Sequence, residues 1–422
     1  MYSSRKALKV AITGVLDLLM VWSAPSAYGA DVAGDRQAPL PQVSCGWPAV
    51  VSPTRLNFAF PESNAVYWLM PYQLGSGERI VAKGTYPFAR FSSLTTYIPT
   101  GSSVDSLADK QIAANPGSLN PTTNANASNN PNQRKYDVTV RAGVAADSGG
   151  NTVAATTGSA ATGSGWLVLR IYAPTNASDP TGGVPLPELS IQGSNGQTRT
   201  IPTCAQAGST QGPAGPLADL ARQLLATASI PGGLEGCGTS TAAAPGFEVP
   251  NKTGGLFPNP YNKYLCTPID YKAGRIVVVR GLAPTFPDTQ AGQSVLTNTQ
   301  LRYWSLCQNQ WRLPYPVSTC AADFQTTLDA NKHYTYVVST PQDRPANATA
   351  ANNVTWLSWG PTNVTGLLIF RNMLPAANFP NAIQNVHVGQ NPAATMGSYF
   401  PTVAYCTKAT FTAGGPNACP AQ

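Results

Sequence analysis

The chain has 422 residues, of which only 11% are charged, and its formal net charge is +7. An ordinary globular protein carries ~25% charged residues, so the polar surface of this chain must be built mainly from Asn, Thr, Ser, Gln and Gly. The basic residues are scattered and form no stripe or patch of the kind that binds nucleic acid, so we expect no nucleic-acid partner.

The first 30 residues have the pattern of a secretory signal peptide. Basic residues precede an apolar run at 10–22, and small residues follow it up to Ala30. The run is shorter than the ~20 apolar residues that span a membrane, and Asp17 interrupts it. We therefore expect cleavage after Gly29 or Ala30, no transmembrane segment after signal removal, and a secreted or periplasmic protein.

Eight cysteines follow the predicted signal peptide, and an even number in an exported chain predicts four disulfides. Cys307 with Cys320 and Cys406 with Cys419 are the two pairs that we predict, because each encloses a short loop rich in Pro, Gly or Asn. No C-x-x-C spacing occurs, and the chain has only two histidines. We therefore expect no metal site and no cofactor.

Glycine and proline number 38 each, which is typical of short strands joined by turns. Segments rich in β-branched and aromatic residues predict strands at 79–84, 91–97, 136–142 and 166–172 in the first half of the chain. Further strands are predicted at 275–281, 334–340 and 366–372 in the second half. The sequence therefore predicts a mainly β protein.

The two sets of predicted strands repeat one pattern. Gly84, "RFSSLT" at 90–95, Tyr136 and "LVLRIYAP" at 167–174 are followed in the same order by Gly281, "RYWSLC" at 302–307, Tyr334 and "LIFRNMLP" at 368–375. The order and the nearly constant spacing of the matches predict an internal duplication. We expect two β-sandwich (jelly-roll-like) domains, at 31–202 and 264–422, with one or two short helices.

The connection between these domains, at 203–263, is rich in Gly, Pro and Ala. Within it, "PLADLARQLLATA" at 216–228 has the apolar spacing of an amphipathic helix, which "IPGG" ends. We expect this helix to cover a sheet edge or the seam between the domains.

The repeated segments resemble a family of exported bacterial proteins of unknown function with paired jelly-roll domains. Its C-terminal domain follows the pattern "FWSLT-Y", "NWLPAP", "L-LR-Y-P" and "PP". Here the first half contains "FSSLTTY" at 91–97 and "LVLRIYAP", and the second contains "YWSLC", "VTWLSWGP" at 354–361 and "LIFRNMLP". The first half lacks the W-L-x-x-x-P element. The resemblance implies the fold, and it implies no activity because none is established for the family.

Four arginines recur at equivalent positions of the two halves, namely Arg90, Arg302, Arg170 and Arg371. An arginine within an apolar strand is costly unless it is paired, so each should have a partner. One interpretation is an anion or carbohydrate site in each domain. The alternative, which we favour, is that each guanidinium stabilises the fold by binding loop carbonyls or a carboxylate such as Asp105 or Asp323.

Aromatic segments supply a second group of candidate ligand-binding residues. Trp304, Trp356 and Trp359 could form a platform for a sugar ring or another small organic ligand at the seam between the domains. Packing in the core is the more ordinary role of tryptophans in short strands. Together with Arg90, Arg302 and Arg371, these tryptophans are the candidate ligand-binding residues, and the candidate ligands are a carbohydrate, a lipid or a small organic molecule.

Catalytic residues stay unassigned. Two of the second-half carboxylates could act as acid and base if the fold brought them together, and these are Asp288, Asp323, Asp329 and Asp343. No G-x-S-x-G elbow occurs, and His333 and His387 are the only imidazole bases. We therefore expect a binding or envelope-associated protein. The alternatives are a secreted hydrolase of glycans or esters with an interdomain cleft, and a structural protein whose seam is packed shut.

Overall fold

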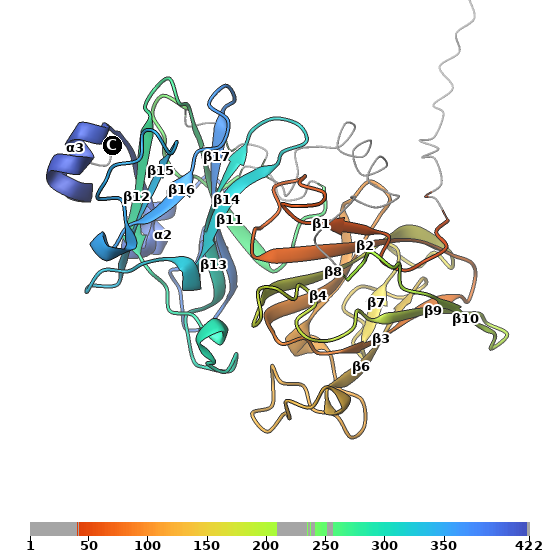
Figure 1. Cartoon of the computed structure of the whole chain (residues 1–422). Helices are drawn as coiled ribbons and strands as arrows, with labels where there is room; N and C mark the ends of the chain where they lie inside the picture. The colour runs from red at the N-terminus through yellow and green to blue at the C-terminus, as the bar shows by residue number, and fades with distance from the viewer. Residues whose placement is uncertain are drawn as a thin grey trace, which may run out of the picture. The chain divides into compact units, whose positions relative to one another are not determined.

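The computed structural model describes residues 40, 42–208, 234, 237, 241–250 and 256–419 (Figure 1). The chain divides into a unit ending at Ala38 and a unit from Pro39 to Gln422, and all described residues belong to the second. The predicted signal peptide and the predicted helix at 216–228 lie outside the described residues. Among the described residues, no helix is long and apolar enough to cross a membrane.

The first half of the chain forms a sandwich of two five-stranded sheets (Figure 1). One sheet has the order β1 (Ala49–Val51), β2 (Ala65–Leu74), β8 (Gly163–Pro174), β4 (Ala89–Tyr97), β5 (Ser103–Ala108). The other has the order β10 (Thr198–Ile201), β9 (Glu188–Gln192), β3 (Arg79–Thr85), β6 (Lys135–Arg141), β7 (Thr152–Ala154). Between them lies an apolar core that includes Trp68, Ile80, Val138 and Leu169.

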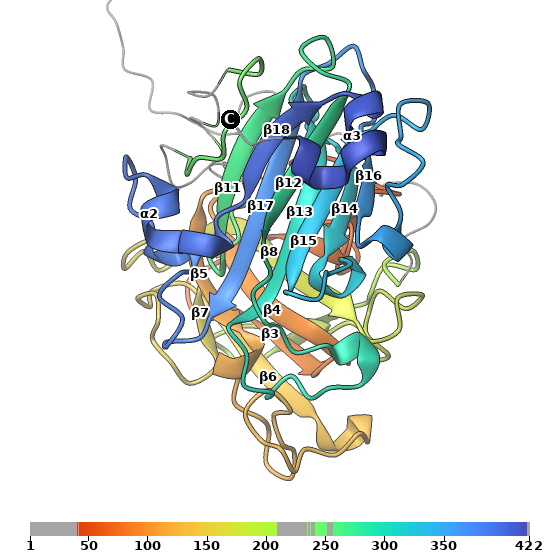
Figure 2. The same cartoon turned by 90° about the vertical axis from the view of Figure 1, so that its left-hand side faces the viewer.

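The second half forms a sandwich of two four-stranded sheets (Figure 2). One sheet has the order β11 (Asn262–Ile269), β17 (Gly366–Pro375), β13 (Leu301–Gln310), β14 (Val317–Ala322). The other has the order β16 (Thr355–Ser358), β15 (His333–Ser339), β12 (Ile276–Leu282), β18 (Thr402–Cys406). Two short helices follow β17 in the chain, α2 (Pro392–Met396) and α3 (Lys408–Gly414), and Phe411 of α3 packs on apolar residues of β12 and β15. The chain is therefore mainly β and has the predicted two β-sandwiches.

The two sandwiches share one strand order. The run β2-β8-β4-β5 corresponds to β11-β17-β13-β14, and the run β9-β3-β6-β7 corresponds to β18-β12-β15-β16. In both sandwiches the last strand of the second run, β7 or β16, pairs in parallel with its neighbour, whereas the other strand pairs are antiparallel. A common strand order is what an internal duplication requires, and the duplication itself stays a prediction.

The repeated glycine and tyrosine have a packing role in each sandwich. Gly84 of β3 is the register partner of Tyr136, and Gly281 of β12 is the register partner of Tyr334. A Cβ atom at Gly84 would lie 2.3 Å from the ring of Tyr136, and one at Gly281 would lie 2.4 Å from the Tyr334 hydroxyl. Each tyrosine therefore lies across a strand position where only glycine leaves room.

Burial along the strands shows where the sandwiches meet. In β6 buried and partly exposed residues alternate, as expected for a sheet with one face in the core. In β4, β8, β13 and β17 nearly every residue is buried, so both faces of these strands are covered. Phe91, Tyr172, Tyr303 and Met373 belong to one apolar cluster formed by both sandwiches. We call this contact between the sheets of β8 and β17 the seam.

Four disulfides connect the described parts of the chain. Cys307–Cys320 and Cys406–Cys419 are the local pairs expected from the sequence. Cys45–Cys204 joins the two ends of the first sandwich, and Cys237–Cys266 attaches the connection to β11. Disulfides of this number fit an oxidising compartment outside the cytoplasm.

Candidate functional site at the seam

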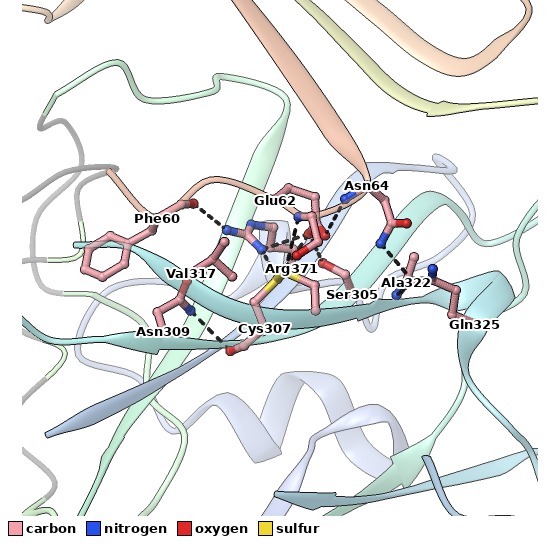
Figure 3. Close-up of a disulfide and its surroundings, with 12 residues drawn as sticks. Phe60, Glu62, Asn64, Ser305, Cys307, Asn309, Val317, Ala322, Gln325 and Arg371 are labelled. Atoms are coloured by element: carbon pink, nitrogen blue, oxygen red, sulfur yellow. Dashed lines mark hydrogen bonds and ion pairs between the residues drawn. A yellow bond between two sulfur atoms is a disulfide. The ribbon is translucent and has the colours of Figure 1, made fainter. Parts of the chain in front are cut away.

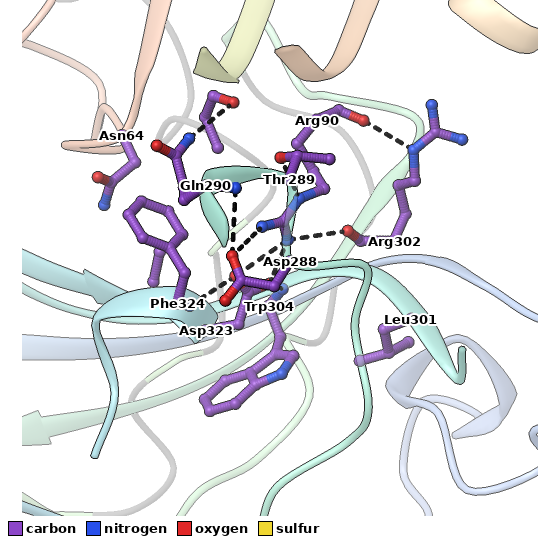
Figure 4. Close-up of polar contacts among 12 residues, drawn as sticks. Asn64, Arg90, Asp288, Thr289, Gln290, Leu301, Arg302, Trp304, Asp323 and Phe324 are labelled. Atoms are coloured by element: carbon purple, nitrogen blue, oxygen red, sulfur yellow. Dashed lines mark hydrogen bonds and ion pairs between the residues drawn. The ribbon is translucent and has the colours of Figure 1, made fainter. Parts of the chain in front are cut away.

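Two of the repeated arginines form crossed ion pairs at the seam, and Figure 4 shows the pair of Arg90 with Asp323. Arg90 of β4 donates from Nη1 to both carboxylate oxygens of Asp323, at 3.0 and 3.1 Å. Arg302 of β13 donates from Nη2 to both carboxylate oxygens of Asp109, at 3.2 and 3.1 Å. The Nε atom of Arg302 also donates to the carbonyl oxygen of Arg90 at 2.7 Å. Each sandwich thus binds a carboxylate of the other.

Local structure holds both carboxylates in place. Asp109 accepts hydrogen bonds from the backbone N–H groups of Ser92 and Lys110, and Asp323 accepts them from Trp304 and Phe324. Burial raises the pKa of Asp323 to about 6, because the loss of water outweighs the stabilisation of the charge by Arg90 and the N–H groups. Burial raises the pKa of Asp109 for the same reason.

The two aspartates belong to a repeated sequence pattern that we did not recognise from the sequence alone. "ADKQ" at 108–111 and "ADFQ" at 322–325 each place a glutamine two residues after the aspartate. Gln111 and Gln325 accept a hydrogen bond from the N–H of the alanine before each aspartate, which closes a short 3-10 turn. The A-D-x-Q pattern could therefore have identified Asp109 and Asp323 as equivalent residues. Asp323 is one of the two predicted partners, whereas Asp105 instead accepts backbone N–H groups of its own sandwich.

Arg371 of β17 has a third buried carboxylate as its partner (Figure 3). It donates from Nη1 to Glu62 at 2.9 Å and to Sγ of Cys307 at 2.6 Å, and from Nη2 to the carbonyl oxygen of Phe60 at 2.9 Å. Glu62 also accepts a hydrogen bond from the Ser305 hydroxyl at 2.6 Å. Burial opposes the charge of Arg371, but the Glu62 carboxylate together with Tyr264, Tyr67 and Tyr172 outweighs it, so the pKa of Arg371 is raised. Glu62 lies in a loop of the first sandwich and follows no sequence pattern that would have identified it.

Arg170 of β8 differs from the other three arginines. Its side chain is buried and donates from Nη2 to the carbonyl oxygen of Phe257 at 3.0 Å. Its guanidinium carbon lies 5.5 Å from the ring centre of Tyr67 and 5.4 Å from that of Tyr97. Its Nη1 atom is buried without a hydrogen-bond partner, and no carboxylate in the described part of the chain forms an ion pair with it.

Arg170 and Arg371 line one cavity of about 70 Å³ at the seam. Tyr67, Tyr172 and Asn259 supply polar atoms to the lining. The rest of the described lining is largely apolar and comes from both sandwiches and the connection: Val51, Phe58, Ala59, Phe60, Pro61, Leu69, Val168, Leu234, Leu256, Phe257, Tyr264 and Ile369. The described lining residues include no carboxylate and no histidine.

The three tryptophans form no platform at the seam cavity, and the core packing favoured from the sequence holds for Trp304 and Trp359. Trp304 and Trp359 are fully buried in the core of the second sandwich, where Trp304 packs against Tyr334 and Phe370. Trp356 lies on β16, donates to the Ser339 hydroxyl at 3.0 Å, and has the guanidinium of Arg344 over its ring. None of the three lines the cavity. Their sizes fill a core, which is the ordinary role of such residues in short strands.

The carboxylates considered for hydrolysis have separate structural contacts. Asp288 accepts two backbone N–H groups of its own turn and lies 4.0 Å from Arg90, beside Asp323 (Figure 4). Asp329 accepts hydrogen bonds within its turn and lies 3.8 Å from Nδ1 of His333. Asp343 accepts a hydrogen bond from Tyr271, which lowers the pKa of Asp343. None of these residues belongs to the described lining of the seam cavity.

The sheets and the seam define a mainly β protein of two packed sandwiches. A crystal structure of an uncharacterised protein from Burkholderia cenocepacia has this fold, with a TM-score of 0.50 at 14% identity over 86% of this chain and 82% of that chain. A crystal structure of a protein from Vibrio parahaemolyticus has a TM-score of 0.40 at 12% identity over 84% of this chain and 92% of that one. No family model matches the chain, and a search of curated proteins gives no match. At these identities the likeness concerns the fold alone.

Proposed function

We propose that this is an exported, secreted or periplasmic binding protein that takes up a small organic ligand in the seam cavity and catalyses no reaction. The observation that carries the proposal is the cavity itself, which is lined by both sandwiches and combines an apolar wall with a few polar groups. This combination is typical of small-molecule sites. The signal peptide, the internal duplication and the resemblance to the exported family belong to the same proposal.

The seam also supports binding over the alternative of a hydrolase. A hydrolase needs two carboxylates, or a histidine beside a hydroxyl, facing a common space. The seam carboxylates Asp109, Asp323 and Glu62 each bind an arginine and further donors, and none belongs to the described cavity lining. The purely structural alternative would require a seam without a cavity.

A thermal-shift screen of the mature protein tests the proposal, because a ligand that binds only the folded state raises the melting temperature. The panel should contain neutral sugars, fatty acids, and small carboxylates with their neutral amides. Val168 lines the cavity, so Val168→Phe should abolish the shift by filling the space. Val388→Phe, at a residue that is 50% exposed, is the matched control and should keep it.

The outcomes of the screen distinguish a binding protein, a hydrolase and a structural protein. A shift that Val168→Phe removes and Val388→Phe preserves supports binding in the cavity. A shift that survives Val168→Phe places the site elsewhere and contradicts the proposal. Turnover of a glycan or ester in the same panel would support the hydrolase, and no shift with any compound class would support the structural alternative.

A further inference from the structure

Three of the four repeated arginines have a carboxylate partner among the described residues, and Arg170 does not. Arg90, Arg302 and Arg371 each lie within 3.1 Å of a buried carboxylate. Arg170 is 3% exposed, and within the described residues it donates to the carbonyl oxygen of Phe257 and has the hydroxyl of Tyr97 as a neutral polar neighbour. An arginine remains charged in a protein, so among the described residues the seam contains a buried positive charge without an acidic partner.

The neighbouring tyrosines do not neutralise this charge. Burial raises the pKa of Tyr67 well above its usual value, and it also raises the pKa of Tyr97. Both hydroxyls therefore stay protonated. The two rings contribute the weaker attraction between a cation and an aromatic face, and the Tyr97 hydroxyl beside the guanidinium carries no negative charge. Removing an ion from water costs several kcal/mol unless a counter-charge is close. A ligand that carries the missing negative charge would offset this cost.

Arg371, the second arginine that lines the cavity, already has a counter-charge and needs no negative charge from a ligand. Arg371 is neutralised by Glu62 at 2.9 Å, so among the described lining residues the uncompensated charge is that of Arg170. The hydroxyls of Tyr67 and Tyr172 lie 3.1 Å from each other and supply polar atoms to the lining. Apart from Asn259, the rest of the described wall is largely apolar. The complementary ligand is therefore a monoanion with a short apolar part.

The size of the cavity limits the ligand further. An engineered apolar cavity of about 150 Å³ binds benzene. The seam cavity of about 70 Å³ is half as large, which leaves room for roughly three to five non-hydrogen atoms by the same comparison. Acetate and propionate have this size.

We propose that the seam cavity binds a short-chain monocarboxylate, with its carboxylate against the guanidinium of Arg170 and its carbon chain against the apolar wall. This inference rests on the proposed binding function and names its ligand class. It makes Arg170 the anchor of the site and assigns Arg90, Arg302 and Arg371 to the stabilisation of the seam.

The test compares propionate with propionamide in a chloride-free buffer, by thermal shift and by calorimetric titration. The two probes have nearly the same shape, so the comparison isolates the charge and needs no variant. Propionate should bind at least tenfold more tightly than propionamide. Arg170→Met should reduce the affinity for propionate at least tenfold, whereas Arg141→Met, the same change at an exposed arginine of β6, should leave the affinity unchanged.

The outcomes separate this inference from the proposed function. Equal binding of propionate and propionamide, blocked by Val168→Phe, would overturn the anion site and preserve a ligand cavity. Binding of chloride that depends on Arg170, without binding of propionate, would overturn the carboxylate assignment. If neither probe bound and the wider screen were also silent, both proposals would fail. Should Arg170→Met not fold, the comparison of acid and amide on the unmodified protein still decides.

Discussion

The partner of each buried arginine determines how much the free energy of unfolding falls when that arginine is removed. Arg371 holds the buried carboxylate of Glu62, whereas Arg170 holds only a backbone carbonyl among the described residues. Removing one partner of a buried ion pair leaves the other charge uncompensated and is strongly destabilising, while removing an unpaired charge leaves no such charge behind. Two residues with similar burial should therefore respond differently to the same substitution.

Arg371→Met should lower the free energy of unfolding by about 3–5 kcal/mol, because Glu62 would stay buried without its cation. Arg170→Met, measured after dialysis against anion-poor buffer, should lower it by about 1 kcal/mol or less, the value of one hydrogen bond. Urea denaturation of both variants measures the difference. A loss at Arg170 as large as that at Arg371 would show that Arg170 has an acidic partner.

The raised pKa of Asp323 should make the stability of the fold depend on pH. Its pKa rises from 3.8 to about 6 on folding, so the folded chain holds the proton over a range where the unfolded chain has lost it. The stability that Asp323 contributes is therefore present below its unfolded pKa of 3.8, and it is lost as the pH rises through its folded pKa of about 6. The full change corresponds to about 3 kcal/mol.

Asp323→Asn removes this titration and nearly preserves the side-chain shape. The difference in unfolding free energy between the original protein and the variant should therefore fall as the pH rises from about 4 to about 6. Denaturation series across this range provide the measurement, and the subtraction cancels the carboxylates that both proteins share. A difference that stays constant with pH would mean that Asp323 titrates normally in the fold.

At the scale of elements, the paired glycine and tyrosine of adjacent strands explain a pattern first seen in the sequence. Gly84→Ala or Gly281→Ala should cost about 1–3 kcal/mol, because the new methyl group would overlap a buried ring that cannot swing away. Gly208→Ala is the control, since nothing lies within 4 Å of a Cβ at that position. Thermal unfolding compares the three variants. Equal stability of all three would contradict the packing described for β3 and β12.

The sequence predicted several strands inside the sheets but not β2, β9 or β13, and not the edges. Strands β3, β4, β6, β8, β12, β15 and β17 overlap predicted segments, because they are long and rich in β-branched and aromatic residues. Strands β1, β7 and β16 have only three or four residues each, which is too short for a periodic pattern. Their pairing depends on neighbours that are distant in the sequence.

The candidate site was predictable only in part for a similar reason. The repetition of Arg90, Arg170, Arg302 and Arg371 showed that these positions matter, and it predicted partners for them. It could not show that Arg371 has a carboxylate partner while Arg170 has none among the described residues, because Glu62 reaches Arg371 from a loop of the other sandwich. Charge balance in a buried site is a property of the assembled fold.

At the scale of the whole molecule, the crossed ion pairs and the aromatic contact at the seam couple the two sandwiches. The rings of Tyr172 and Tyr303 meet edge to face across the seam, with centres 5.5 Å apart. The protein should therefore unfold in one calorimetric transition, and Tyr303→Glu, which buries an unpaired charge there, should separate it into two. Two independent transitions in the original protein would show that the seam does not couple the sandwiches.

The central claim is that the buried charge of Arg170 is completed by a small carboxylate. A crystal structure of the mature protein, purified without organic acids and then soaked with propionate, tests this claim most directly. We predict electron density for the carboxylate about 2.7–3.2 Å from a guanidinium nitrogen of Arg170, with the carbon chain toward Val168 and Ile369. An acidic side chain of the protein in that position, or a cavity unchanged by the soak, would contradict the account.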